Sequence, residues 1–208
     1  YCHLMSWIIV GLGNSGEEYE GTRHNTGRMV LDFFAKDMKF GEWKVDTKAK
    51  AQVAGGMIDR IAVVLVEPNT FMNKSGTAVA KFVSAKGGSA SGGKSKPERM
   101  VVIYDDLDLP LGTLKISFDR GSGGHKGVES IMQALKTKKF TRVRIGISPS
   151  TSSGSVKKPT GEKEVVNFIL KKFRSAELAD LTPVFKKAAH ALQTIVAEGP
   201  ERAMNQFN

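Results

Sequence analysis

An apolar stretch that runs into a glycine-rich turn constrains the fold of this chain most. Residues 7–10 (Trp-Ile-Ile-Val) are apolar at every position, which is typical of a central strand covered on both faces. The turn at residues 11–16 (Gly-Leu-Gly-Asn-Ser-Gly) follows at once, and a helical apolar pattern begins near residue 29. Between them lies a polar loop, and open α/β sheets form their sites beyond the carboxyl ends of strands. The loop carries Asn14, Tyr19, His24 and Asn25.

Strand and helix patterns alternate along the rest of the 208 residues, which favours the α/β class. We predict a single domain over residues 1–208, a three-layer sandwich with a mixed, mostly parallel central sheet and helices on both faces. Further strands are expected at 50–58, 60–66, 100–104, 113–118 and 143–147. Helices are expected from 29 to near 41, at 75–85, 128–135 and 162–170, and from Thr182-Pro183 to Gly199. The Gly-, Ser- and Lys-rich stretch at 86–97 is expected to be a flexible surface loop.

The net charge of +10 favours a polyanionic partner. Nucleic acid ranks ahead of a membrane because no basic amphipathic helix stands out, and a solvated lysine-rich surface is the alternative. No apolar run approaches the roughly 20 residues that span a bilayer. The first residues show no secretory signal, although a transit peptide already removed stays open. Cys2 is the only cysteine, which excludes an internal disulfide and a cysteine metal cluster.

The glycine-rich turn also matches the dinucleotide-binding pattern G-x-G-x-x-G. That pattern needs a helix that opens at the third glycine, so that the N-terminus of the helix faces the diphosphate. Here an acidic run follows instead, made of Glu17, Glu18 and Glu20. No acidic residue closes the second expected strand about 20 residues on, since Asp32 lies inside the first expected helix. The dinucleotide interpretation is therefore disfavoured.

Several blocks of the chain, in this order, resemble the bacterial-type peptidyl-tRNA hydrolases. The first is G-L-G-N-x-G followed by Y and by T-R-H-N-x-G, within residues 11–27. The next are E-P-N-T-F-M-N-K-S-G (67–76) and V-I-Y-D-D-L-D-L-P-L-G (102–112). The last are G-S-G-G-H-K-G (121–127) and R-V-R-I-G-I (142–147). The resemblance extends over most of the chain.

The resemblance implies hydrolysis of the ester that joins a peptide, or an N-blocked amino acid, to the 3′ end of tRNA. This reaction frees tRNA stranded by premature release during translation. It implies neither metal nor cofactor, because one general base can activate water for an ester. His24 matches this base, and an imidazole suits the role because its ordinary pKa is about 6.5. Asp105 matches the carboxylate that orients the base. The alternative for His24 is a structural histidine. The alternative for Asp105 is a turn or cap residue, which is also how Asp106 and Asp108 are interpreted.

Asparagines match the remaining catalytic positions of the family. Asn14 and Asn73 would hold the substrate end and the water, since neutral amides both donate and accept hydrogen bonds. A helix cap is the alternative for Asn73. Tyr19 matches a tyrosine that can stack on the terminal base of the tRNA, or it is a packing residue.

Further positions match substrate-binding and tRNA-binding residues of the family. Lys115 and Arg144 match a clamp on the tRNA 5′ phosphate, with solvated strand residues as the alternative. The remaining members of this set are Phe71, His125 and Lys126. For His125 a structural or binding role ranks above a catalytic one.

Three positions depart from the usual pattern of the family. Ser15 stands where proline is common. Ser117 stands where a second phosphate-binding lysine is common, and Arg120 is a candidate to compensate. Lys126 stands where the family usually has a substrate-binding asparagine, and a lysine cannot accept a hydrogen bond. Lys126 is expected to reach a phosphate near the tRNA 3′ end instead, and also to lower turnover.

The departure at Lys126 leaves a second class of function open. The same fold has been recruited in organelles as an RNA-splicing factor, which binds RNA without catalysis. The presence of Asn14, His24, Asn73 and Asp105 together favours the enzyme. The resemblance also implies a monomer with no obligate protein partner and no membrane association. The expected compartment is the cytoplasm, with a mitochondrion or another organelle as the alternative.

Overall fold

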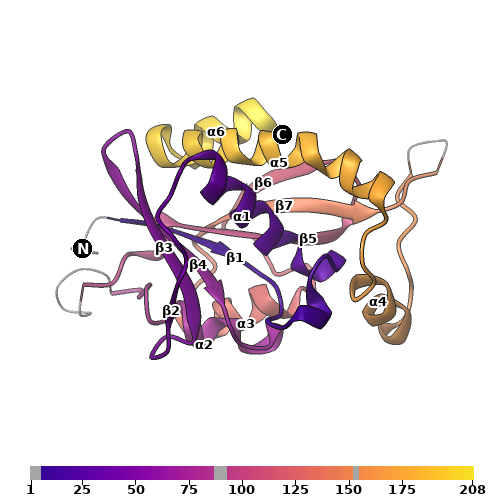
Figure 1. Ribbon diagram of the computed structural model, residues 1–208, viewed down its shortest axis with the longest axis horizontal. Helices are drawn as coiled ribbons and strands as arrows, with labels where there is room; N and C mark the ends of the chain where they lie inside the picture. Colours follow the sequence, from indigo (N-terminus) through magenta and orange to yellow (C-terminus); the bar gives the residue numbers. More distant parts are fainter. Residues whose placement is uncertain (1–5, 87–92, 152–154) are drawn as a thin grey trace.

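The computed structural model describes residues 6–86, 93–151 and 155–208, and their strands form one sheet (Figure 1). The seven strands lie in the order β2-β3-β4-β1-β5-β7-β6. The apolar stretch near the start of the chain is the central strand β1 (Trp7–Gly11), buried at every position. The others are β2 (Lys44–Asp46), β3 (Ala51–Ile58), β4 (Ile61–Pro68), β5 (Met100–Pro110), β6 (Leu114–Phe118) and β7 (Thr141–Ser148).

The sheet is parallel at its centre and antiparallel towards both edges. β1 pairs in parallel with β4 and with β5, and β5 pairs in parallel with β7. The pairs β2–β3, β3–β4 and β6–β7 are antiparallel. Only β3 and β6 therefore run against the other described strands. The predicted mixed sheet of the α/β class is confirmed.

Helices cover both faces of the sheet because successive side chains of each strand point to opposite sides. On β1, Ile9 packs into one apolar cluster with α1 (Thr26–Asp37), α5 (Ser175–Glu198) and α6 (Pro200–Phe207). Ile8 and Val10 pack into the other cluster, with α2 (Ser75–Val79) and α3 (Lys126–Leu135). Figure 1 shows α5 and α6 above the sheet and α2 and α3 below it. The last helix, α4 (Glu162–Ile169), stands at one end and buries none of its residues, all of which the structure describes.

The predicted start of the longest helix at Thr182-Pro183 is wrong. α5 begins at Ser175, and Pro183 lies inside it. A capping box between Arg174 and Glu177 starts the helix earlier, because the Glu177 carboxylate accepts the Arg174 backbone N–H at 2.8 Å. The pattern of buried positions then continues across the proline with Leu181 and Val184. Packing of this apolar face outweighs the hydrogen bond that Pro183 cannot donate.

Other differences concern short elements and one loop. The α-helix expected at 75–85 ends at Val79, whereas β2 and α6 were not predicted. In the stretch expected to be a flexible loop at 86–97, residues 87–92 lie outside the described residues. Its described part is held, since Ser95 donates its Oγ–H to the Ser6 carbonyl oxygen at 2.7 Å. Among the described helices, none has both the length and the apolar character needed to cross a membrane. That residues 1–208 form a single domain stays a prediction.

Candidate active site

The polar loop after β1 is held against the sheet by a close backbone approach. The Leu12 N–H donates to the Ile103 carbonyl oxygen of β5 at 3.0 Å. A Cβ on Gly27 would lie 2.3 Å from that same oxygen, so the first turn of α1 can pass here only as glycine. The loop is therefore folded back over the carboxyl ends of β1 and β5. This geometry brings Asn14, His24 and Asn25 to one place beside Asp105.

Asn14 is fixed through its backbone and its side chain. Its N–H donates to Oδ1 of Asn25 at 2.9 Å, and Nδ2 of Asn25 donates back to the Asn14 carbonyl oxygen at 2.9 Å. Oδ1 of Asn14 accepts the backbone N–H of Met72 at 2.9 Å. This bond assigns the amide orientation and leaves Nδ2 of Asn14 as a donor without an acceptor among the described residues. Such a neutral donor can bind a developing oxyanion.

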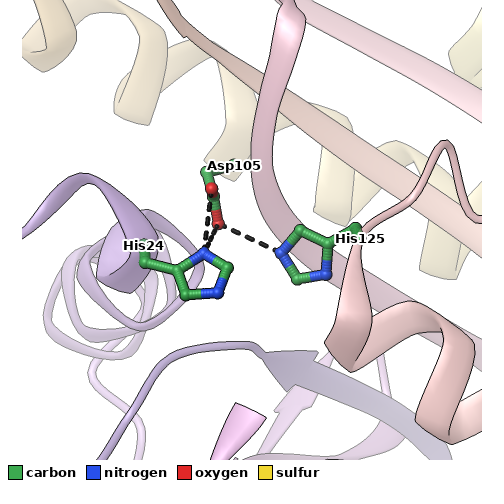
Figure 2. A group of neighbouring side chains, drawn as sticks. All are labelled: His24, Asp105 and His125. Atoms are coloured by element: carbon green, nitrogen blue, oxygen red, sulfur yellow. Dashed lines mark hydrogen bonds and ion pairs between the residues drawn. The ribbon is translucent and has the colours of Figure 1, made fainter. Parts of the chain in front are cut away.

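His24 and His125 both contact the carboxylate of Asp105, which comes from β5 (Figure 2). Nδ1 of His24 lies 3.0 Å from each carboxylate oxygen, and Nε2 of His125 lies 3.2 Å from Oδ1. Nδ1 of His125 accepts the Val128 N–H at 3.3 Å and so caps α3. His125 therefore carries its proton on Nε2, and His24 carries its proton on Nδ1. Figure 2 shows the remaining nitrogen of His24, Nε2, turned away from the carboxylate and available as a base.

The electrostatics of this cluster keep Asp105 ionised. Burial alone would raise the pKa of Asp105, but the two histidines, through their charge when protonated and through their hydrogen bonds, outweigh it and hold the pKa well below its usual range. Burial alone would lower the pKa of His24, but the charge and hydrogen bond of Asp105 outweigh it and raise this pKa above 6.5. His24 is thus a base strengthened by a carboxylate that stays negative.

A cavity of about 270 Å³ opens beside the His24–Asp105–His125 cluster, and all three residues line it. Its opposite wall is largely apolar and comes from α4, through Val165, Val166 and Ile169. Lys126 is the first residue of α3 and also lines the cavity. Its side chain is 68% exposed, and its Nζ lies 3.8 Å from Glu129. The cation is therefore free to turn towards a ligand.

Three other predicted site residues are neighbours in sequence of residues at the site. No hydrogen bond or ring contact joins them to His24 or His125 in the described chain. Phe71 and Asn73 flank Met72, whose N–H binds Asn14, and both are exposed. Asn73 makes no cap hydrogen bond to α2. Tyr19 is half-buried in the 3-10 turn η2 (Glu17–Tyr19).

Lys115 and Arg144 are directly opposite each other on β6 and β7. They line a second cavity, of about 650 Å³, together with Arg120 and Arg142. Nε of Arg144 lies 2.6 Å from Oδ2 of Asp106, which raises the pKa of Arg144 against the effect of burial. Ser117 also lines this cavity, and its buried Oγ has no hydrogen-bond partner in the described chain. The four basic side chains make this cavity suitable for a phosphate group.

Some contacts of the site were not predicted from the sequence. The double hydrogen bond from Asn25 to the Asn14 backbone depends on the turn between them, and the Met72 N–H is a backbone group without a side-chain signal. Asp106 as the partner of Arg144 could have been found, because it follows the predicted carboxylate directly. The acidic run that argued against a dinucleotide site folds into η2, and the first α-helix opens only at Thr26. The turn therefore lacks the helix N-terminus that a diphosphate needs.

Known proteins resemble this chain in sequence and in structure over almost its whole length. A family model described as peptidyl-tRNA hydrolase matches residues 8–208. A peptidyl-tRNA hydrolase from Carboxydothermus hydrogenoformans is 41% identical over 202 residues, which are 97% of this chain and 98% of the relative. One from Aquifex aeolicus is 39% identical over 97% of this chain and 95% of its own. The crystal structure of peptidyl-tRNA hydrolase from Acinetobacter baumannii aligns with a TM-score of 0.83 and 30% identity, covering 100% of this chain and 96% of the other. The chain therefore belongs to the peptidyl-tRNA hydrolase family.

Proposed function

We propose that this protein hydrolyses the ester bond of peptidyl-tRNA and releases free tRNA and peptide, with His24 as the general base. The observation that carries the proposal is the contact of Nδ1 of His24 with the buried carboxylate of Asp105, which leaves Nε2 available. Membership of the family supports the choice of substrate. The roles of the individual residues are inferred from their geometry and from the resemblance of the motifs.

The chemistry needs one proton carrier and at least one oxyanion donor. Nε2 of His24 takes a proton from water while the water oxygen attacks the ester carbonyl carbon. The carbonyl electrons move to its oxygen, which Nδ2 of Asn14 stabilises, and Asn73 supplies a second amide. The bond to the ribose oxygen then breaks, and that oxygen takes the proton from His24. Asp105 holds the imidazole in the required tautomer and stabilises the imidazolium formed in between.

The tRNA part of the substrate is assigned to the aromatic and basic residues around the site. Tyr19 stacks on the terminal base of the CCA end, and Phe71, His125 and Lys126 hold the neighbouring substrate. Lys115 and Arg144 bind the 5′ phosphate. Arg120, which lines the same cavity, supplies the charge that Ser117 lacks. We further infer a monomer that acts in the cytoplasm, with an organelle as the alternative compartment.

The proposal is tested with N-acetyl-aminoacyl-tRNA and free aminoacyl-tRNA as substrates. We expect hydrolysis of the blocked substrate only, and a loss of at least about 100-fold in His24→Ala, as is usual when a general base is removed. His190→Ala is the matched control, because His190 is exposed on α5; it should retain the wild-type rate. Activity that survives in His24→Ala would contradict the mechanism. Binding of tRNA without any hydrolysis would favour the RNA-binding class instead.

A further inference from the structure

An acid-lined hollow reaches Asn14 and Asn25 without including the His24–Asp105–His125 cluster in its lining. Its volume is about 810 Å³. Four carboxylate side chains line it, and Arg28 is the one basic side chain among its described lining residues. The four are Glu17, Glu20, Asp32 and Glu67. The local charge is thus opposite in sign to the net charge of +10 of the whole chain.

Glu67 leaves part of its hydrogen-bonding capacity unused. It is 3% exposed, and its Oε2 accepts a hydrogen bond from Nε of Arg28 at 3.1 Å and lies 2.9 Å from Nη2 of the same guanidinium. Its Oε1 is buried and has no hydrogen-bond partner among the described residues. Burial raises the pKa of Glu67 to about 7, and the negative charge of Asp32 adds a smaller increase. The positive charge of Arg28 lowers this pKa but does not cancel the increase. Arg28 alone therefore does not compensate this carboxylate, and a further cation or N–H donor would.

Trp43 gives the hollow an aromatic wall next to these carboxylates. It lines the hollow and is half-buried. Burial raises the pKa of Asp32, and a hydrogen bond from the Trp43 side chain to this carboxylate acts in the opposite direction. Carboxylates beside an indole face are the surroundings that favour an ammonium or guanidinium group, through ion pairing and cation–π attraction. The phosphates of tRNA, in contrast, would be repelled here.

We propose that this hollow binds an organic cation, an ammonium or guanidinium group, carried by the peptide of the substrate. The inference rests on the proposed function, because it assigns the peptide side of the ester to the hollow that repels phosphate. Asn14 belongs to both the hollow and the proposed catalytic set, which puts the hollow within reach of the ester. The enzyme would then prefer peptides that carry lysine or arginine near the ester.

The test compares lysine with norleucine, which lacks only the ammonium group, in N-acetyl-tripeptides esterified to one tRNA. The residue is placed at each of the three positions in turn. We expect kcat/KM to favour lysine by about fivefold to tenfold at one position at least, as a partly exposed cation–π and ion-pair site allows. Asp32→Asn and the exposed Glu20→Gln should each bring that ratio at least about threefold closer to one. Glu198→Gln, which changes a carboxylate paired with Arg202 on the surface, should leave the ratio as it is.

The outcomes separate this inference from the proposed function and from another source of the cation. Equal hydrolysis of the lysine and norleucine esters at all positions overturns the assignment of the hollow to a cation of the peptide and leaves the hydrolase intact. A wild-type protein that cleaves none of these esters overturns both. Tryptophan fluorescence, titrated with spermidine and separately with N-acetyl-lysine methylamide, tests for a free polyamine. Spermidine binding with a lysine-to-norleucine ratio of one would overturn the peptide assignment.

Discussion

At the scale of single residues, Asp105 is a carboxylate shared by two imidazoles with different tasks. The second nitrogen of His24 points away from Asp105, whereas the second nitrogen of His125 caps α3 through Val128. We therefore infer that only His24 exchanges a proton with substrate and that His125 acts on it through the shared carboxylate. Changes at Asp105 and at His125 should consequently move the basicity of His24 in opposite directions.

The pH dependence of kcat/KM tests this arrangement. The base must be neutral to act, so the rate should rise with pH through the pKa of His24, which lies above its ordinary value of about 6.5. Asp105→Asn removes the charge that raises this pKa and leaves burial, which lowers it. We expect the rising limb to move to lower pH and the plateau to fall at least about tenfold. The measurement is kcat/KM between pH 5.5 and 8.5 on a blocked aminoacyl-tRNA.

His125→Phe provides the opposite displacement. It removes one hydrogen-bond donor from Asp105, so the carboxylate interacts more strongly with His24 and the limb should move to higher pH. The lost helix cap should also cost about 1 kcal/mol of unfolding free energy. If the rising limbs of Asp105→Asn and His125→Phe shift in the same direction, Asp105 does not link the two histidines.

The motifs predicted the partnership of His24 with Asp105 but not the position of His125 on the same carboxylate. The difference is physical. The pairing of His24 follows from two strand ends at the same edge of a parallel sheet, which a sequence pattern can suggest. The contact of His125 depends on its rotamer and on the Val128 N–H that it accepts, and neither has a signature in the sequence.

At the scale of elements, one buried arginine links α4 and the start of α5 to the loop that carries His24. Arg23, next to His24, donates from Nη2 to both carboxylate oxygens of Glu177 at 2.8 and 3.0 Å. Its Nη1 donates to the Lys171 and Lys172 carbonyl oxygens at 3.1 Å. The guanidinium also lies 4.7 Å from the ring of Phe168 in α4. These contacts, together with backbone hydrogen bonds of the same loop and the packing of Phe168 and Ile169 on the core, hold the α4 wall of the cavity beside His24.

Replacing this arginine should widen the cavity before it disturbs the chemistry. Arg23→Lys keeps the charge but cannot reach the carboxylate and two carbonyl oxygens together. We expect the free energy of unfolding to fall by about 2 to 4 kcal/mol, because the half-buried Glu177 loses the two hydrogen bonds of a buried guanidinium and two backbone carbonyl oxygens lose their donor. We also expect KM to rise by a larger factor than kcat falls, since α4 forms a wall and not part of the histidine cluster. Urea unfolding and steady-state kinetics measure the two effects.

Arg174→Gln is the matched control, because Arg174 approaches the same carboxylate at 3.4 Å with a side chain that is 80% exposed. An exposed pair of this kind should contribute less than about 1 kcal/mol and leave KM unchanged. Equal changes in the two variants would mean that the position of α4 does not depend on the buried arginine.

The strands were easier to predict than the ends of the helices, for a reason that α5 makes plain. β4 follows a continuous apolar run and β7 carries β-branched residues at alternate positions, and the bounds of β3, β4 and β7 lie within two residues of those expected. Pro183, in contrast, has the local signature of a first helical turn, and only the buried contacts of Leu181 and Val184 show that the helix runs through it. Tertiary packing decided the boundary, not local propensity.

At the scale of the whole molecule, charges of opposite sign line two separate cavities. Lys115, Arg120, Arg142 and Arg144 line one cavity, and four carboxylates line the hollow beside Asn14. Net charge alone predicted a polyanionic partner but could not locate it, because sequence order separates residues that the β6–β7 pairing brings together. A substrate with an anionic and a neutral or cationic half would be oriented by this distribution.

The salt dependence of the reaction tests whether the basic cavity binds a single phosphate. Each phosphate that a cation neutralises contributes about 0.7 to 0.9 to the slope of log(kcat/KM) against log of salt concentration. Lys115→Gln should therefore lower that slope by about 1, and removal of the 5′ phosphate from the tRNA should do the same to the wild type. Combining the two changes should add nothing further, since both remove the same contact. Lys44→Gln is the control, because Lys44 is exposed on β2, at the opposite edge of the sheet from β6. If Lys44→Gln lowers the slope as much as Lys115→Gln, tRNA responds to the overall charge of +10, and the paired cations on β6 and β7 form no phosphate site.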